Sequence, residues 1–547
     1  AIDLGSTTDD AANTLELSDA ELDRITAGTL RIGDSLTGAI TISQALTPAG
    51  TSRLRLQNNS TVSQSAEIEV PELAVTAHGT IDLYNVANVV TRVALFTSSS
   101  SSVFKARDAL EITTVDGVQG VGATNGGVIV ATVDGDLTIS DTTNWWEVKG
   151  NTVRLQAGGA DRKLTLASSA QIDTQTGGWI PGVTTELYAD KIALDGQIAA
   201  GGAYVQLAPS TNGVAINLGS TTDAAANTLE LSDVELDRIT AGGIRIGSST
   251  TGGMTVTAAL TPANSGFLHL ISGSSVTESS GAGIRVGQLA VDAGGAVNLF
   301  QSSNDVDLVA VRTTAGTIDF YDPDGYAVGA VDGVNGMTTP AGAINLYSFS
   351  GDIEIADTPA AKDISGPADY QVNVILMQGG TSLLVAPGAT VSGHGITVFA
   401  DRVELGGTLE TSPGRRVEFS TTDTAAALAL SDAELDRITA GSIWIGNSNS
   451  GPLSLTQLIS PANSSSLVLV SGGTVTQSAP ILISNLAVQA ASSIDLGLSA
   501  NDVDVLTAQA TAGSVTFADQ DALTIGQVAT LFPYSGAFAG NGNVVLT

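Results

Sequence analysis

Alternating apolar and polar residues recur along the whole chain in short runs. Early examples cover residues 29–32, 39–42, 53–56, 73–75 and 80–83. This period of two places successive side chains on opposite faces, so it predicts strands with one buried and one wet face. Turn residues such as Asn58-Asn59 and His78-Gly79 separate the runs, and helical periodicity is nearly absent. The pattern indicates an all-β protein made of many short strands.

One longer segment repeats almost unchanged. It reads LSDAELDRITAG at Leu17 to Gly28, and it returns at Leu231 to Gly242 and at Leu430 to Gly441. The offsets are 214 residues (231 − 17) and 199 residues (430 − 231). The sequence therefore predicts super-repeats of about 200 residues. We place them at 1–214, 215–415 and 416–547, the third being truncated, and expect the array to continue in a longer chain.

Many short alternating strands occur in sandwiches and barrels as well as in solenoids. Here the strand-and-turn pattern runs on without a visible linker, and the second super-repeat is shorter than the first by about a dozen residues. Stacked coils accept such differences as loops, whereas a closed barrel would lose its register. The pattern therefore favours a parallel β-solenoid, in which each coil buries its aliphatic side chains against the coils above and below.

The repeated segment departs from the strand pattern. Ser18 and Glu21 have the spacing of a capping box, and Leu22 and Ile25 lie three residues apart on one face. We predict one helical turn after Ser18, with Leu22 and Ile25 packed against the coil. Gly28 then allows the chain to re-enter a strand through an unusual backbone angle. Near-identity in all three super-repeats indicates a shared structural corner.

The same segment carries three carboxylates at alternate positions. Asp19, Glu21 and Asp23 offer oxygen donors at i, i+2 and i+4, a spacing that calcium loops use. Arg24 would compete for these carboxylates, and the alternative is a capped corner in which Arg24 pairs with Asp19 or Asp23. Calcium stays open as an interpretation, and no other cofactor is expected.

Composition and charge narrow the class of partner. Aromatic residues make up 4% of the chain, cysteine is absent, and 55 acidic residues against 21 basic ones give a net charge of −34. Such a surface repels nucleic acid and anionic membranes, and no thiol chemistry is available. No apolar run approaches the roughly 18–20 residues that span a bilayer.

The tryptophans are the candidate contact residues. Trp145 and Trp146 stand together in a polar insertion, and Trp179 precedes a proline. Aromatic faces on a β-rod can stack on sugars, so this region is the predicted ligand contact; the alternative is that it covers an irregular coil. Trp444 occupies the strand position of Arg31 and Arg245, which should face outward. We expect it to make a lateral contact between rods.

The phrase LSDAELDRITAGTLRIG, followed by GAITIS and LAVTAHGTIDL, resembles the repeats of filamentous-haemagglutinin-type exoproteins of Gram-negative bacteria. It is also similar to other giant β-strand-repeat surface proteins. The resemblance covers essentially the whole chain. It implies a right-handed parallel β-helix that is exported to the cell surface or the medium, with roles in adhesion, biofilm or fibrous coats.

An enzyme is not expected. His78, His269 and His394 fit surface positions, and no strained Gly-x-Ser-x-Gly turn marks a nucleophile. The pair of carboxylates that glycoside hydrolysis needs cannot be assembled from the sequence, although Asn304-Asp305-Val306-Asp307 recurs at 501–504.

We therefore expect a non-catalytic structural or adhesive rod segment of a long extracellular or cell-surface protein. Its partners would be neighbouring segments of the same chain, further copies, cell-surface glycans or other cells. The alternative hypothesis is a carbohydrate-binding or polysaccharide-cleaving β-helix.

Overall fold

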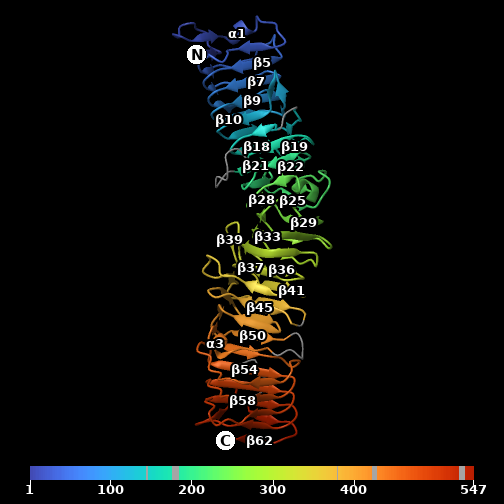
Figure 1. Cartoon of the computed structure of the whole chain (residues 1–547), viewed down its shortest axis with the longest axis vertical. Helices are drawn as coiled ribbons and strands as arrows, with labels where there is room; N and C mark the ends of the chain where they lie inside the picture. Colours follow the sequence, from blue (N-terminus) through green and yellow to red (C-terminus); the bar gives the residue numbers. More distant parts are fainter. Residues whose placement is uncertain (143–145, 175–183, 379, 422–427, 529–535) are drawn as a thin grey trace. The chain divides into compact units, whose positions relative to one another are not determined.

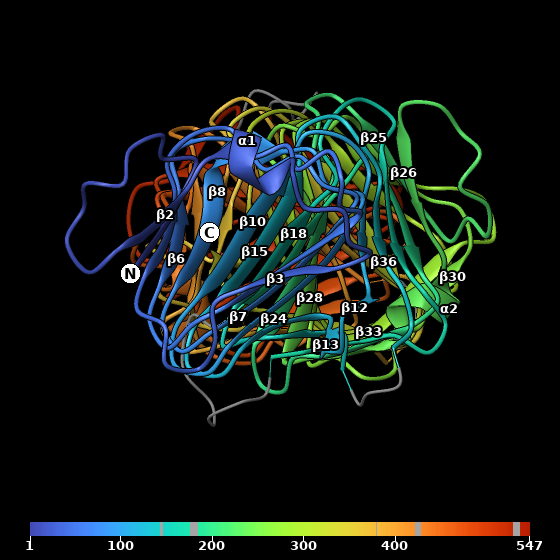
Figure 2. The same cartoon turned by 90° about the horizontal axis from the view of Figure 1, so that it is seen from above.

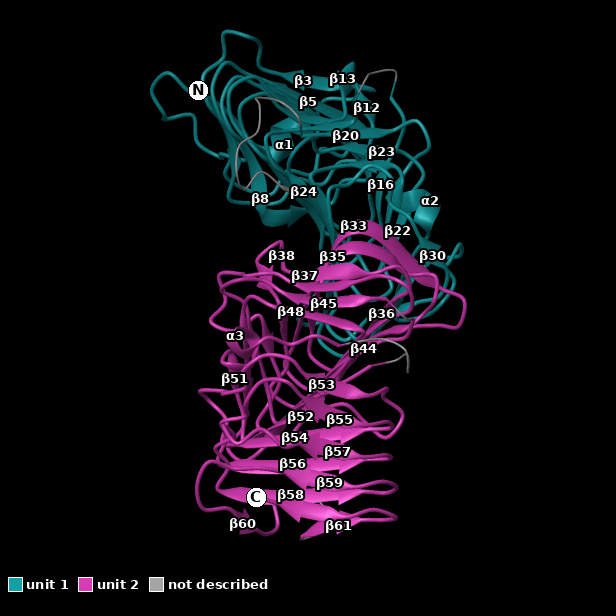
Figure 3. Ribbon diagram, turned by 60° about the horizontal axis from the view of Figure 1, so that its bottom comes forward, with its two compact units in different colours: residues 1–275 teal, residues 276–547 magenta. Residues whose placement is uncertain are grey.

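The structure is a computed structural model that describes residues 1–142, 146–174, 184–378, 380–421, 428–528 and 536–547. The chain forms two compact units, Ala1–Ser275 and Val276–Thr547, which Figure 3 colours separately. Each unit is a stretch of chain that packs mainly against itself, whereas the predicted super-repeats are stretches of similar sequence. The two kinds of boundary therefore describe different properties of the chain. Each unit is described here by itself.

In the first unit, parallel strands stack at steps of about one coil. Strands β5 (Arg53–Gln57), β7 (Glu72–Ala77) and β9 (Arg92–Thr97) follow one another in Figure 1. Leu54 lies beside Leu73, and Leu73 beside Val93, at separations of 19 (73 − 54) and 20 (93 − 73) residues. All three side chains are fully buried. Each such side chain contributes roughly 1.5–3 kcal/mol by leaving water, so the stacked aliphatics hold neighbouring coils together.

A second wall of the same unit shows the same stacking. Figure 2 shows β8 (Ile81–Asn88), β10 (Ser102–Ala106), β15 (Val128–Thr132) and β18 (Val153–Gln156) side by side. Strands β21 (Thr184–Tyr188) and β24 (Tyr204–Ala208) extend this row. One inward position of the six strands is occupied by Leu83, Phe104, Val130, Leu155, Leu187 and Leu207. Their partners above and below exclude water from the centre of the coil.

One wall divides where a hairpin is inserted. The first half of β9 pairs with β11 (Leu110–Ile112), and its second half pairs with β14 (Val121–Ala123). Between them, β12 (Thr114–Val115) and β13 (Val118–Gln119) form an antiparallel hairpin. Below the division, one row continues through β16 (Leu137–Ile139) and β19 (Lys163–Leu166). The other row continues through β17 (Val148–Lys149), β20 (Gln171–Asp173) and β23 (Gln197–Ala199).

The second unit has the same construction. Its row of parallel strands includes β36 (Ile318–Asp322), β41 (Ile344–Ser348), β44 (Val372–Leu376), β47 (Ile396–Phe399) and β50 (Arg416–Ser420). Inward residues of these strands again stack in register: Phe320, Leu346, Val374, Val398 and Phe419. The prediction of an all-β fold built from long rows of stacked parallel strands is confirmed, and this is the arrangement of a parallel β-solenoid.

Candidate functional sites

The repeated segment forms a capped helical corner in each of its three occurrences. The helical turns are α1 (Asp19–Leu22), α2 (Asp233–Leu236) and α3 (Asp432–Leu435), and each begins with a Ser–Glu capping box. In the first, the backbone N–H and the hydroxyl of Ser18 donate to Glu21 Oε2 at 2.9 and 2.8 Å. This arrangement satisfies N-terminal donors that a short helix leaves open.

The aspartates of the corner bind the loop of the next coil. Asp19 accepts hydrogen bonds from the backbone N–H of Thr47 at 2.6 Å and from its hydroxyl at 2.8 Å. Asp23 accepts a bond from the N–H of Ala49 at 2.8 Å. The later occurrences repeat these bonds at 2.5–2.9 Å: Thr261 donates to Asp233, Ala263 to Asp237, Ser460 to Asp432 and Ala462 to Asp436. The three carboxylates of a corner thus hold separate pieces of backbone.

This geometry bears on the calcium interpretation. Asp19, Glu21 and Asp23 each accept hydrogen bonds from protein donors. Within the described ranges, no group of three or more His, Cys, Asp or Glu side chains is arranged to hold a metal ion. Calcium at the corner stays an open interpretation beside the capped corner.

The apolar anchors of the corner differ between occurrences. Leu22, Leu236 and Leu435 are at most 1% exposed. Ile239 and Ile438 are also fully buried, because they pair with Ile198 and Leu409 on the preceding coil. Ile25 is 39% exposed, so the prediction that it packs against the coil is wrong for the first occurrence.

The glycine that ends the corner has a different role from the predicted one. Gly28, Gly242 and Gly441 are not among the residues with a left-handed backbone conformation, so the expectation of an unusual angle at Gly28 is wrong. A Cβ atom on Gly242 would instead lie 2.2 Å from the carbonyl oxygen of Gly202, and one on Gly441 would lie 2.5 Å from Gly414. Glycine is required there because the preceding coil approaches closely.

The corner arginine also reaches the preceding coil. Arg238 lies 3.7 Å from the Asp195 carboxylate, and Arg437 donates to the carbonyl of Gly406 at 2.7 Å. The aspartates that were alternative partners of Arg24 are occupied by Thr47 and Ala49.

The predicted tryptophan contacts are only partly described. Trp145 and Trp179 lie outside the described residues. Trp146 is half-buried on the outer face of the first unit, and the Lys149 ammonium lies 5.8 Å from the centre of its ring. It lines a cavity together with Phe96 and Arg55.

Trp444 lies on β52 (Ser442–Ile445), between inward-facing Ile443 and half-buried Ile445. Its ring packs against the buried cluster of Val468, Ala487 and Val528, and the Arg416 guanidinium lies 4.5 Å from the ring centre. Its indole N–H donates to Ser442 Oγ at 2.9 Å. Part of the Trp444 ring therefore packs against side chains of the second unit itself. The lateral contact between rods stays a prediction.

The hairpins over the outer face were not predicted. Val115 and Val118 of the first hairpin bury Ala74 and Ala94, which face outward from β7 and β9. Arg31 holds the hairpin tip through two bonds of 2.9 Å to Asp116, and this guanidinium lowers the pKa of the Asp116 carboxyl. A second hairpin, β38 (Ala330–Val331) and β39 (Val334–Asn335), has the same VDGV tip. The sequence signal for a covering hairpin is a small apolar residue at an outward strand position, as in Leu73-Ala74-Val75 and Val93-Ala94-Leu95.

A polar pair inside the coils was also missed. Asn88 and Gln64 exchange two amide hydrogen bonds at 3.0 and 3.1 Å, and Asn501 and Gln477 do the same at 3.1 and 2.8 Å. Asn88 and Asn501 are fully buried. In this position the second super-repeat has Asn304 with Glu278, and burial raises the pKa of Glu278 to about 7.

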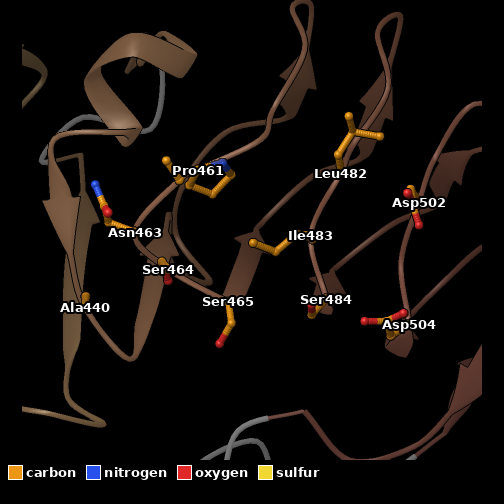
Figure 4. A pocket seen from close by; sticks show the side chains of 11 residues that line it. Ala440, Pro461, Asn463, Ser464, Ser465, Leu482, Ile483, Ser484, Asp502 and Asp504 are labelled. Atoms are coloured by element: carbon orange, nitrogen blue, oxygen red, sulfur yellow. The ribbon is translucent and has the colours of Figure 1, made fainter.

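The repeated Asn-Asp-Val-Asp motif therefore has two faces. Asn501 points into the coil, whereas Asp502 and Asp504 line an open cavity of about 650 Å³ on the second unit (Figure 4). Asn463, Ser464, Ser465 and Ser484 line the same cavity. The cavity is polar and acidic, and its carboxylates lie on the surface.

The surface assignment of the histidines is wrong for His269, which is 5% exposed. It lies on β31 (Leu268–Ser272) at the outward position beside Arg245. An outward-facing side chain is therefore buried on this strand as well as on β7 and β9.

The helical turns of the described chain are too short to cross a bilayer. Comparisons with protein families, with curated proteins and with solved structures give no significant match. The function is therefore argued from the geometry of this chain.

Proposed function

We propose that this chain is a structural or adhesive segment of a long exported protein of the bacterial cell surface or extracellular fibre. It works without catalysis, by carrying a regular, acidic surface over many coils. Its partners are further copies of this chain, neighbouring segments of the same long chain and glycans of other cells. The sequence resemblance to filamentous-haemagglutinin-type repeats supports the location outside the cell.

One observation carries the proposal. The hydrogen bonds that the following coil donates to the first corner aspartate recur three times, with distances that agree within about 0.1 Å. Catalytic residues normally occur at one place in a repeat protein, whereas the contacts that hold stacked repeats together recur in each repeat. The most invariant residues of this sequence thus serve to join coils.

The finer architecture belongs to the same proposal. We assign a right-handed coil, because parallel strand connections in one sheet are right-handed in nearly all proteins. We also assign a structural period of about 200 residues, marked by one corner and one division of the outer wall. The divisions follow β9, β35 (Asp305–Thr313) and β58 (Val505–Ala510), each of which pairs with two later strands.

A second candidate is a carbohydrate-binding or polysaccharide-cleaving β-helix. It is favoured by the cavity beside Trp146, which has aromatic walls, and by the acidic cavity that contains Asp502 and Asp504. Binding of glycans is compatible with an adhesive segment, so the two candidates differ in whether a glycosidic bond is cleaved.

Surface display tests the proposal. The chain is displayed on non-adherent bacterial cells through a carrier anchor, and attachment to epithelial cells and between bacteria is counted. The proposal predicts an increase in one of these, reduced by soluble chain added as competitor. A display control with the same anchor and an unrelated domain shows the background. Unchanged attachment in both assays would contradict an adhesive role.

A further inference from the structure

A cavity of about 260 Å³ opens on the outer face of the first unit under the tip of the β12–β13 hairpin. Its walls are the side chains of Arg55, Thr76, Phe96 and Trp146, together with hairpin residues 117–119. This volume equals that of about nine water molecules, which is enough for one ring-sized group. The cavity combines aromatic surface with a few polar groups, as small-molecule sites do.

Arg55 differs from the arginines around it. Arg31 pairs with Asp116, and Arg53 and Arg92 both pair with Glu72. Arg55 instead donates to the hydroxyl of Thr76 at 2.8 Å and to the backbone carbonyl of Asp116 at 3.5 Å.

Among the described residues, no carboxylate lies within ion-pair distance of Arg55. Its guanidinium is half-buried, and desolvation lowers its pKa. The nearby Asp116 carboxylate acts on Arg55 through its charge, but it forms its ion pair with Arg31. A partly desolvated guanidinium that has no ion pair of its own favours a ligand that brings a carboxylate.

The aromatic walls depend on a glycine. A Cβ atom on Gly122 would lie 2.8 Å from Trp146 Cη2 and 3.1 Å from Phe96 Cδ2. Both rings therefore occupy space that any larger residue at this position would take. Gly122 lies beside Phe96, and Phe96 beside Thr76, on successive strands of the outer wall.

The second super-repeat has an ion pair at the corresponding place on the same wall. Asp292, Arg312 and Thr338 lie beside one another there, in the register of Thr76, Phe96 and Gly122. Arg312 donates to Asp292 through two bonds of 2.7 and 2.8 Å, so an ion pair occupies the positions that Thr76 and Phe96 have in the first super-repeat. The first super-repeat replaces this ion pair with an aromatic wall and a smaller residue. The structural role of the wall does not require this replacement.

We propose that the cavity binds a carboxylate-bearing sugar ring, such as a terminal uronic or sialic acid residue of a glycan. The carboxylate pairs with the Arg55 guanidinium, the ring lies against Trp146 and Phe96, and Thr76 and Gln119 bond the hydroxyl groups. A chain with net charge −34 repels polyanions, so a glycan with one acidic residue at its end fits better than a polyanionic one. This inference rests on the adhesive function proposed above, for which it supplies a ligand class.

Calorimetry and saturation-transfer NMR on the full chain test it with four probes: N-acetylneuraminic acid, glucuronic acid, glucose and N-acetylphenylalanine. The proposal predicts binding of at least one acidic sugar and weaker binding of glucose. Arg55→Gln, which keeps a donor for Thr76, should weaken binding at least tenfold, since it removes the charge-assisted pair with the ligand carboxylate. Gly122→Thr should weaken it similarly by displacing Trp146. Arg312→Gln, at the corresponding ion pair of the second super-repeat, is the matched control and should leave binding unchanged.

Failure to bind either acidic sugar would overturn the inference, as would equal binding of glucose. Binding of N-acetylphenylalanine alone would assign the cavity to a peptide carboxylate and overturn it too. Circular dichroism of each variant separates lost binding from lost folding. If Arg55→Gln abolishes sugar binding and displayed cells still attach, adhesion stands and uses another surface. If wild-type chain binds the sugar and displayed cells never attach, the adhesive function fails independently.

Discussion

Asn304 donates a hydrogen bond of 3.1 Å from its amide to Glu278 Oε2 inside the coil, and Glu278 Oε1 has no partner among the described residues. In the other two super-repeats a glutamine stands in place of Glu278 and exchanges two bonds with the asparagine. A protonated Glu278 resembles this glutamine because it can donate as well as accept. An ionised Glu278 cannot donate, and it is buried as a charge.

The pH dependence of stability follows from this pair. Burial raises the pKa of Glu278 from 4.5 to about 7 in the folded chain. Its contribution to stability is therefore complete below about pH 4.5 and is lost as the pH rises through 7. The shift corresponds to about 3 kcal/mol. Glu278→Gln should slow amide exchange in residues 276–322 at pH 8 and change it little at pH 4.

Asp322, whose pKa is raised to about 8 by burial, is present in both proteins, so it cancels in this comparison. The converse variant Gln477→Glu is the matched control and should create the same pH dependence in the third super-repeat. Equal exchange of Glu278→Gln and wild-type protein at pH 8 would contradict the account.

The corner glycines predict opposite results for the same substitution. Gly242→Ala should destabilise the first unit by roughly 2 kcal/mol or more, because the new methyl group would overlap the carbonyl of Gly202. Gly28→Ala should be tolerated, since no atom lies within 4 Å of the added Cβ. Denaturant unfolding of the two variants measures the difference. Similar losses in both would mean that backbone conformation, and not close approach, selects glycine.

Neighbouring positions of one helical turn provide a test of the corner anchor. Leu236→Asp puts a charge at a fully buried site and should cost several kcal/mol, visible as fast exchange in β26 (Thr228–Leu231) and β28 (Gly243–Ser248). Val234 is 60% exposed in the same turn, so Val234→Asp is the control and should have little effect. A coil that tolerates Leu236→Asp as well as Val234→Asp would refute the anchoring role.

The calcium interpretation can be tested by chelation. Because Asp19 and Asp23 already accept bonds from Thr47 and Ala49, we expect the same melting temperature with calcium and with excess chelator. Differential scanning calorimetry under both conditions measures this. A rise of several degrees with calcium, lost in Asp19→Asn, would place the ion at the corner.

Local patterns in the sequence predicted the repeating elements of the fold. Period-two alternation predicted the strands, and the Ser–Glu spacing predicted the capped turn, because both depend on neighbours within a few residues. The hairpins were missed because their stability depends on outward alanines such as Ala74 and Ala94, which are 20 residues (94 − 74) apart in sequence and adjacent in the sheet.

The role of the corner glycine was missed for a related reason. Gly242 is constrained by Gly202, forty residues (242 − 202) earlier, and no local signal reports that approach. Likewise, the sequence shows that Glu278 stands where the first super-repeat has Gln64. The raised pKa of Glu278 follows only from its burial, which the sequence does not show. The candidate cavity beside Trp146 also combines residues from β5, β7 and the hairpin.

The central claim is that the chain joins and adheres without cleaving its ligands. The most direct measurement incubates purified chain with a panel of immobilised neutral and acid-terminated glycans, and it records retained protein and released oligosaccharide in the same samples. The account predicts retention on at least one acid-terminated glycan, with no release above that of heat-denatured chain. Release of oligosaccharide in proportion to the concentration of folded chain would contradict it.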